Sequence, residues 1–243
     1  MWKQEDVDPF KDEPQPEVAA IRNGEDLDWE TVESFIRQSL PNEIDTSGEF
    51  QVRQFPNGAA NLTYLVSFGR TELVLRRPPF GNLAPGAHDM AREFKVLSEL
   101  WKIFSKAPRA YIFSDDIEVA GAEMFVMERR EGEVIRGVVP PSMRHHEKLG
   151  HRIGHALASA VAEFHSLNPA DINLESLGRP EGFVLRQVEG WKKRWDLVAD
   201  ERYDNEMSDL YDALLSDMPD PQRVAFVHND LKLDNCMFKS DNP

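Results

Sequence analysis

Apolar residues in this chain change their spacing at defined points, and this change limits the folds that the chain can adopt. In the first third of the chain, apolar and polar residues mostly alternate, in the segments 50–55 (FQVRQF), 61–68 (NLTYLVSF) and 71–76 (TELVLR). A period of two is typical of β-strands. The dipeptide GR alone separates the last two segments, as in a tight hairpin turn. We therefore expect an antiparallel sheet.

Segment 88–105 has a different period, with apolar residues at every third or fourth position. These residues are Met90, Phe94, Leu97, Trp101 and Phe104. This spacing predicts an amphipathic helix. Segments 109–115 and 123–129 predict two further strands, and segment 26–41 predicts a helix ahead of the sheet, with Asp26 or Asp28 as its N-cap.

After Pro141 the pattern becomes mainly helical. Three apolar stripes predict three helices: Leu149, Ile153, Leu157, Val161 and Phe164; Val184, Val188, Trp191, Trp195 and Val198; and Met207, Leu210, Tyr211 and Leu214. The segment RVAFVHND (223–230) predicts one more strand near the end of the chain. We expect an α+β fold with two lobes, a β-rich lobe over 25–130 and a partial helical lobe over 131–243, joined near Glu128 to Gly132.

Composition excludes several classes of protein. A formal net charge of −15 argues against binding to duplex nucleic acid, which needs clustered Lys and Arg, although residues 70–109 carry a local excess of four positive charges. The single Cys236 excludes an intrachain disulfide framework. No apolar run is long enough to span a bilayer. We therefore expect a cytoplasmic protein with no membrane or nucleic-acid partner, and a flexible acidic lead-in over 1–24.

The segment HNDLKLDN (228–235) concentrates polar chemistry. Asp230 precedes Asn235 by five residues, on a loop expected to follow a strand. A carboxylate that accepts a hydroxyl proton and an amide oxygen that binds Mg²⁺ are two requirements of phosphoryl transfer. Arg76 at the end of a predicted strand and Glu93 on the next predicted helix supply a cation for phosphates and an acid to orient it. The sequence therefore indicates a phosphoryl-transfer site.

The motifs in their order along the chain resemble the aminoglycoside phosphotransferase-like, or choline kinase-like, family of small-molecule kinases, which is related in fold to protein kinases. The matching segments are NGAANLTYLV, LVLRRPP, AREFKVL, FVMERREG and HNDLKLDN, with a weaker match in RQVEGW. The chain is most similar to the subgroup that is also found fused ahead of acyl-CoA dehydrogenases.

The resemblance implies a role for each matched position and implies ATP and Mg²⁺ as cofactors. It makes Asp230 the catalytic carboxylate and Asn235 a metal ligand. It makes Arg76 the cation on the nucleotide phosphates, oriented by Glu93. It also places Asn61 in the hairpin that covers the phosphates, and it places the adenine against the backbone around Met127 and Glu128.

Three departures from the wider kinase pattern accompany these matches. The covering hairpin retains only Gly58 of a glycine-rich loop, and Arg76 stands where protein kinases have lysine. The family's second metal-binding Asp follows the catalytic loop, but here only CMFKSDNP follows Asn235, and Asp241 lies in a turn-like SDNP segment. We therefore expect a C-terminally truncated chain that is poorly active by itself.

The sequence leaves the acceptor open among aminoglycosides, choline-like alcohols and hydroxyacyl thioesters, with the subgroup resemblance favouring the thioesters. The leading hypothesis is an ATP-dependent phosphotransferase that moves the γ-phosphoryl group to a hydroxyl of a small molecule. The alternative is a nucleotide-binding pseudokinase or regulatory module without turnover. In either case we expect fusion to, or association with, a downstream domain.

Overall fold

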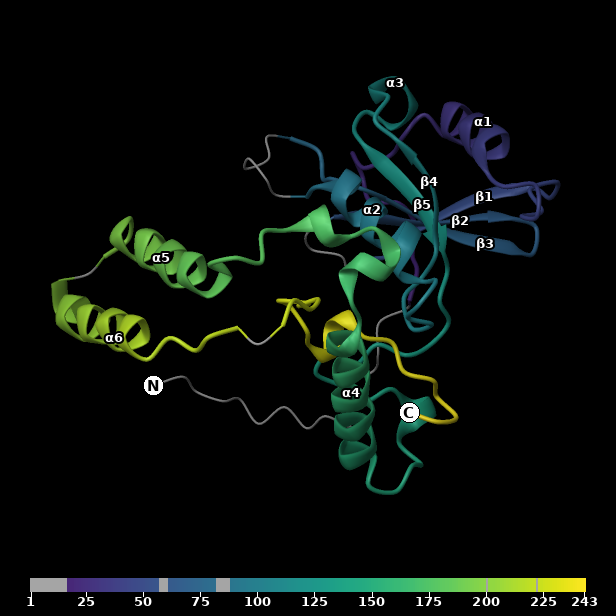
Figure 1. Ribbon diagram of the computed structural model, residues 1–243. Helices are drawn as coiled ribbons and strands as arrows, with labels where there is room; N and C mark the ends of the chain where they lie inside the picture. The colour runs from purple at the N-terminus through teal and green to yellow at the C-terminus, as the bar shows by residue number, and fades with distance from the viewer. Residues whose placement is uncertain (1–16, 57–60, 82–87, 200, 222) are drawn as a thin grey trace. The chain divides into compact units, whose positions relative to one another are not determined.

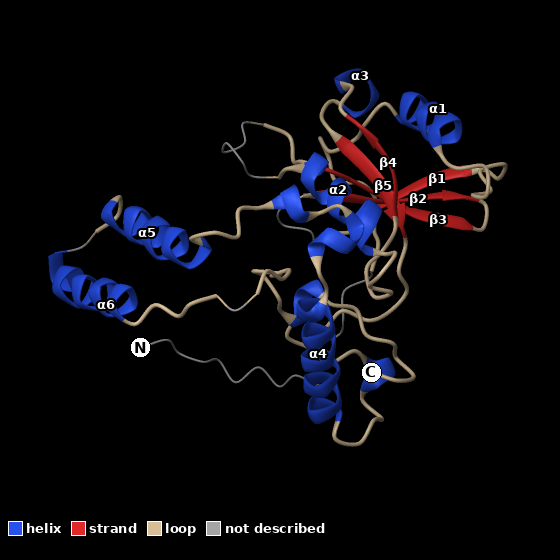
Figure 2. Cartoon of the chain, viewed as in Figure 1, coloured by secondary structure: helices blue, strands red, loops and turns tan. Residues whose placement is uncertain are grey.

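The computed structural model of the chain describes residues 17–56, 61–81, 88–199, 201–221 and 223–243. It contains a five-stranded antiparallel sheet in the order β1-β2-β3-β5-β4, drawn in red in Figure 2. The strands are β1 (Phe50–Gln54), β2 (Leu62–Phe68), β3 (Thr71–Arg77), β4 (Ala110–Ser114) and β5 (Met124–Glu128). All five were expected. Gly69 begins the two-residue turn between β2 and β3 with φ of 61°, a conformation that glycine adopts without strain.

Helices and short 3₁₀ turns accompany the sheet along the described chain (Figure 1). The α-helices are α1 (Trp29–Ser39), α2 (Met90–Leu100), α3 (Ile117–Ala120), α4 (Leu149–Ser166), α5 (Phe183–Asp196) and α6 (Asp204–Ser216). Short 3₁₀ turns are η1 (Pro141–Met143), η2 (Pro169–Ile172), η3 (Glu175–Leu177), η4 (Glu201–Tyr203) and η5 (Leu233–Asn235). Within the described residues, no helix combines the length and the apolar character needed to cross a membrane.

The described residues form two compact units. One contains residues 17–166 together with 227–243, and the other contains Leu167–Phe226. Neither limit coincides with the lobe boundary expected near Glu128 to Gly132, and that boundary stays a prediction.

One face of the sheet carries the larger core of the first unit. Alternate residues of β2 and β3, among them Tyr64, Val66, Leu73 and Leu75, are buried together with residues from α1 and α3. The α1 helix starts where expected, because the Asp28 carboxylate accepts the backbone N–H of Thr31 and caps the helix. Alternation along the strands thus produces one apolar face, as the sequence pattern predicted.

The opposite face of the sheet packs against α2. Met90 and Phe94 of this helix contact Ala110 and Phe125 of the sheet in a second apolar cluster. The helix ends at Leu100, four residues before the last apolar residue of the expected stripe. The backbone N–H groups of Ile103 and Phe104 both bond to the Leu100 carbonyl, so the chain turns there. The Phe104 ring then packs 5.5 Å from the Phe164 ring of α4, outside the α2 stripe.

Residues 17–24, the described part of the expected lead-in, are hydrogen-bonded to the sheet. Residues 1–16 lie outside the described residues. Ala19 and Gln54 exchange backbone hydrogen bonds of 2.8 and 2.9 Å, and the Arg22 N–H donates to the Gln54 side chain at 2.8 Å. Gln54 is buried. Residues 17–24 are thus bonded to the sheet, and the Arg22 bond satisfies the buried Gln54 side chain. The flexible lead-in expected over 1–24 stays a prediction.

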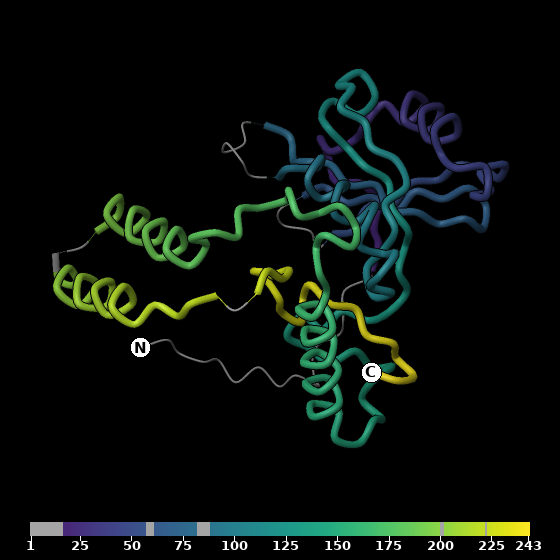
Figure 3. Tube along the Cα trace, in the orientation of Figure 1, coloured from purple at the N-terminus to yellow at the C-terminus, as the bar shows by residue number. Residues whose placement is uncertain are grey.

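The last residues of the chain pack beside α4 within the first unit, as the tube in Figure 3 shows. Ile135, Met143, Ile153 and Phe238 form a small buried cluster. Glu133 and Phe238 also exchange backbone hydrogen bonds of 2.8 and 2.9 Å. These contacts hold the segment that follows the HNDLKLDN motif.

The strand expected over 223–230 is wrong, since residues 224–228 have no regular structure. Val224 is 54% exposed and Val227 is 49% exposed. A strand needs a neighbour to satisfy its backbone groups, and apolar composition alone does not supply one.

In the second unit, the expected helices α5 and α6 form, but neither contains a buried residue. Trp191 is 66% exposed. Their apolar stripes are therefore partly exposed, although helical spacing indicates a buried face.

We expect Tyr64 to make the fold sensitive to alkaline pH. Burial raises the pKa of Tyr64 to about 12 from an ordinary value of 10.0, and its hydroxyl donates to the Glu25 carbonyl at 2.6 Å. The folded state holds the phenolic proton more tightly than the unfolded state. This contribution is complete below pH 10 and is lost as pH rises toward 12, a change of roughly 2 to 3 kcal/mol in the free energy of unfolding.

Urea unfolding of wild type and Tyr64→Phe at pH 9 and at pH 11.5 checks this expectation. The free energy of unfolding should fall more steeply for wild type than for Tyr64→Phe, which has no phenolic proton. Equal slopes for the two proteins would contradict it.

Candidate active site

The loop that follows Asn229 folds around the Asn235 side chain. The Asn235 amide nitrogen Nδ2 donates to the Asp230 carbonyl oxygen at 2.7 Å and to the Asp230 carboxylate oxygen Oδ2 at 2.8 Å. Asn229 has φ of 63°, in the left-handed region that asparagine enters more readily than most residues. The two residues that the sequence singled out, five positions apart, therefore contact each other directly.

In this geometry, the nitrogen and the oxygen of the Asn235 amide have different roles. Its nitrogen is used to orient the Asp230 carboxylate, so the oxygen Oδ1 is the part of the group that suits a hard cation. Both side chains are exposed, which leaves the carboxylate accessible to a substrate.

His228 supports the loop. The Asp230 backbone N–H donates to its Nδ1 atom at 3.3 Å, and its ring lies edge-on to the Phe164 ring of α4, with centroids 6.5 Å apart. His228 thereby joins the Asp230 loop to α4, which is a structural contact with backbone and aromatic partners.

Arg76 and Glu93 form the expected ion pair between β3 and α2. Arg76 Nη1 lies 3.1 Å from Glu93 Oε2, and their side chains are 29% and 33% exposed. The amide nitrogen of Asn61 donates to the other Glu93 oxygen, Oε1, at 3.3 Å. The Asn61 oxygen Oδ1, which can only accept, accepts a hydrogen bond from the His88 ring nitrogen Nδ1 at 2.6 Å.

His88 contacts the Asn61, Arg76 and Glu93 cluster through Asn61, and the sequence did not indicate it. It lies one residue before the Asp89 cap of α2 and 27 residues after Asn61, and no helical or strand spacing relates two positions so far apart. Only its place beside a helix cap on the Pro- and Gly-rich loop marks it in the sequence.

Arg76 and Arg77 are adjacent, and the pleat of β3 sends them to opposite faces of the sheet. Arg77 is 2% exposed, and it donates to the Ala120 carbonyl at 2.8 Å and to the Pro78 carbonyl at 3.0 Å. Its guanidinium lies 3.9 Å from the Phe80 ring centroid. Burial lowers the pKa of Arg77. Arg77 is therefore a buried structural residue on the core side of the sheet, and Arg76 is the arginine that lies beside α2.

The segment around Met127 and Glu128 is an ordered strand end. Met127 pairs with Val74 of β3, and Val74 pairs with Leu65 of β2, so these three residues share the face that carries Arg76. The Glu128 N–H donates to the Arg109 carbonyl at 2.8 Å, and the Arg109 N–H donates to the Glu128 carboxylate at 3.0 Å. The Glu128 N–H is therefore already used.

The predicted residues fall into two clusters. Asn61, Arg76 and Glu93 are in contact, and so are Asp230 and Asn235, but no hydrogen bond or ion pair that the structure describes joins the two sets. Gly58 lies outside the described residues. Over the described part of the chain, no three side chains of His, Cys, Asp or Glu converge as a metal site.

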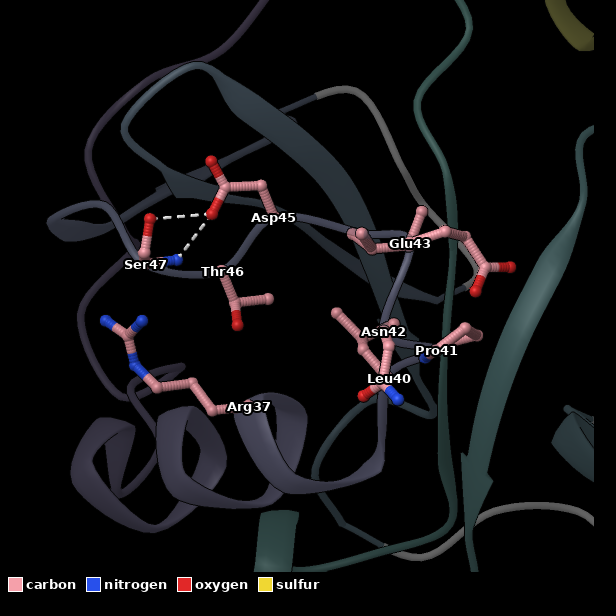
Figure 4. A pocket seen from close by; sticks show the side chains of 9 residues that line it. Arg37, Leu40, Pro41, Asn42, Glu43, Asp45, Thr46 and Ser47 are labelled. Atoms are coloured by element: carbon pink, nitrogen blue, oxygen red, sulfur yellow. Dashed lines mark hydrogen bonds between the residues drawn. The ribbon is translucent and has the colours of Figure 1, made fainter.

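A surface hollow near the end of α1 lies among none of the predicted residues. Figure 4 shows its lining, which runs from Arg37 to Ser47. The Ser47 hydroxyl and backbone N–H both donate to the Asp45 carboxylate, which lowers the pKa of Asp45. Arg37 is bound to Glu33 and to the Gly48 carbonyl. Asp45 and Arg37 of the hollow are thus already bonded to neighbouring protein groups.

Known proteins share sequence similarity over the region that carries both clusters. The model of the phosphotransferase enzyme family matches residues 51–243. The chain belongs to the phosphotransferase enzyme family. The matched segment includes both clusters. Asn61, Arg76 and Glu93 lie in its first part, and Asp230 and Asn235 lie near its end.

Two solved structures share the fold of this family member. A protein of Ralstonia eutropha JMP134, provisionally named an aminoglycoside phosphotransferase, is 26% identical with a TM-score of 0.70 over 88% of this chain and 61% of that one. Choline kinase from Cryptosporidium parvum Iowa II has a TM-score of 0.55 at 16% identity, over 88% of this chain and 62% of that one. The kinase-like α+β fold expected from the sequence is thereby confirmed.

The curated relatives carry names of acyl-CoA dehydrogenases. Acyl-CoA dehydrogenase family member 11 of Mus musculus is 30% identical over 214 residues, and that of Gallus gallus is 28% identical over 226 residues. A probable acyl-CoA dehydrogenase, IBR3, of Arabidopsis thaliana is 28% identical over 233 residues. The chain is matched over 87 to 92% of its length but spans only 27 to 29% of these three relatives. The expected subgroup is thus confirmed.

Proposed function

We propose that this domain transfers the γ-phosphoryl group of ATP to a hydroxyl group of a small molecule. The observation that carries the proposal is the hydrogen bond from Asn235 to the Asp230 carboxylate, which holds an exposed general base in a fixed orientation. Kinases position such a carboxylate at the attacking hydroxyl. The family match supports the same class of reaction.

Asp230 and Arg76 have separate tasks in this reaction. The acceptor oxygen forms a bond to the γ-phosphorus as the bond from that phosphorus to the bridging β–γ oxygen breaks, and the hydroxyl proton passes to the Asp230 carboxylate. Arg76 donates to phosphate oxygens, and Glu93 holds the guanidinium by its ion pair. Positioning and charge stabilisation then supply most of the acceleration.

The residues present fit a magnesium ion in the chemistry of their donors. Asn235 Oδ1 is a hard oxygen donor, and its amide nitrogen is occupied by Asp230. When bound, Mg²⁺ would neutralise charge on the phosphates. Mg²⁺ commonly takes few protein ligands and completes its coordination with phosphate and water oxygens.

The adenine of ATP would lie against the strand end at Met127 and Glu128. Val74 and Met127 present apolar side chains on the sheet face that carries Arg76. Because the Glu128 N–H is bound to Arg109, the polar contacts to adenine would come from other backbone groups of this segment.

Among the acceptor classes, a hydroxyacyl thioester is the first to test. The relatives of this chain are named acyl-CoA dehydrogenases, which act on acyl thioesters, and a kinase domain joined to such an enzyme would share its substrate class. In that arrangement the partner of this domain is a downstream domain of the same polypeptide.

A transfer assay with the full-length protein that contains these residues tests the proposal. The protein is supplied with magnesium and γ-labelled ATP and with aminoglycosides, choline-like alcohols or hydroxyacyl thioesters in turn. We expect label to appear on one acceptor class. ATP binding without transfer to any hydroxyl would instead favour the nucleotide-binding module without turnover.

A further inference from the structure

The Arg76–Glu93 pair is the end of a longer chain of contacts. His88, on the segment before α2, contacts Asn61 at 2.6 Å; Asn61, just ahead of β2, contacts Glu93 at 3.3 Å; and Glu93 contacts Arg76 at 3.1 Å. Four side chains from three segments of the sequence thus form one connected series that ends at the guanidinium expected to meet phosphates.

The chemistry of the groups gives this series a single direction. Asn61 Oδ1 can only accept, so the hydrogen of the contact with His88 lies on the histidine Nδ1 atom. Asn61 Nδ2 can only donate, and a carboxylate oxygen of Glu93 receives it. If the Asn61 amide were rotated by 180°, its oxygen would face the Glu93 carboxylate. The series therefore fixes the Asn61 amide and the His88 tautomer together.

Burial makes Asn61 the rigid part of the series. Asn61 is 7% exposed, whereas Arg76 and Glu93 are 29% and 33% exposed. A partly exposed ion pair between two long side chains is weak by itself and does not hold one geometry. His88 has φ of 60°, a conformation that persists in non-glycine residues where surrounding contacts require it.

We propose that His88 and Asn61 are positioning residues, which hold Glu93 and thereby set the orientation of the Arg76 guanidinium toward the nucleotide phosphates. The proposal rests on the proposed function, since it concerns how the same site binds ATP. His88 acts through Asn61 and Glu93 and does not contact the nucleotide.

Two substitutions at one position isolate the hydrogen-bond donor. Glycine and asparagine both accept a positive φ, so His88→Gly removes the ring and His88→Asn restores an N–H donor near the place of Nδ1, with little backbone strain in either variant. We expect His88→Gly to raise KM for ATP by about 3- to 10-fold with a smaller change in kcat, because one hydrogen bond in the series is lost. His88→Asn should recover most of that loss.

A double variant separates positioning from direct contact. In an Arg76→Ala background, His88→Gly should change KM for ATP by less than about 2-fold, because its effect passes through an arginine that is no longer present. His155→Gln, at an exposed histidine of α4, is the matched control and should leave KM unchanged.

The same comparisons are made on the dissociation constant of magnesium-ATP with the full-length protein, which requires no turnover. Weaker binding by His88→Gly, recovery by His88→Asn and loss of the effect without Arg76 would support the proposal even if no acceptor is phosphorylated, in which case only the proposed function fails. Unchanged binding by His88→Gly, or additive effects with Arg76→Ala, would overturn it. If wild type binds no ATP, both proposals fail.

Discussion

Replacing Asp230 with asparagine should lower kcat for phosphoryl transfer by about 10²- to 10⁴-fold, the scale of a positioned proton-transfer group. The variant keeps the shape of the loop. Asn235 Nδ2 still donates to the Asp230 carbonyl oxygen, and the new amide oxygen can accept the second bond that the carboxylate received. The loss would therefore report the carboxylate's proton acceptance, with little contribution from a displaced loop.

Steady-state kinetics of the full-length protein with its acceptor measure this effect. KM for ATP should change far less than kcat, because Asp230 serves the acceptor hydroxyl. Asp241→Asn, at a residue of the turn-like SDNP segment, is the matched control and should be close to wild type. An unaltered kcat in Asp230→Asn would remove the catalytic role of this residue.

Replacing Arg76 with alanine should weaken magnesium-ATP binding by about 10- to 100-fold, the scale of one lost hydrogen bond between charged groups. The loss has two sources, because the phosphates lose a donor and Glu93 is left beside them without its 3.1 Å partner. Arg76→Lys should lose less, since it keeps the charge but not the planar fork of donors.

Isothermal titration of the full-length protein with magnesium-ATP measures this effect. Adding Glu93→Gln to Arg76→Ala removes the leftover negative charge and should recover part of the affinity, which separates the two sources. Arg53→Ala, at an exposed arginine of β1, is the matched control. Equal affinity of wild type and Arg76→Ala would exclude a phosphate contact by this arginine.

Local patterns predicted the elements that depend on local physics. Alternating residues in 61–68 and 71–76 became β2 and β3, and the GR dipeptide became their turn. Asp28 caps α1 as expected. These outcomes follow because strand pleat, helix spacing and caps involve residues within about four positions of each other.

Predictions that depended on distant partners were less reliable. The apolar run at 223–228 predicted a strand and formed none, because a strand exists only with a neighbour. The stripe of 88–105 predicted a helix through Phe104, but that ring packs on Phe164, 60 positions away in the sequence, and α2 ends at Leu100. Exposed Trp191 shows the same limit, since helical spacing does not ensure a covering surface.

The sequence by itself determined the fold class, the strand and helix order, and the presence of Arg76, Glu93, Asp230 and Asn235 in matching motifs. Only the tertiary structure decided which groups meet: it turned Arg76 to Glu93 and Arg77 to the Ala120 carbonyl, and it brought His88 against Asn61. The physical reason is that hydrogen bonds and ion pairs act over about 3 Å in space, whatever the separation along the chain. Periodicity specifies the face on which a side chain lies, and packing of distant segments specifies its partner.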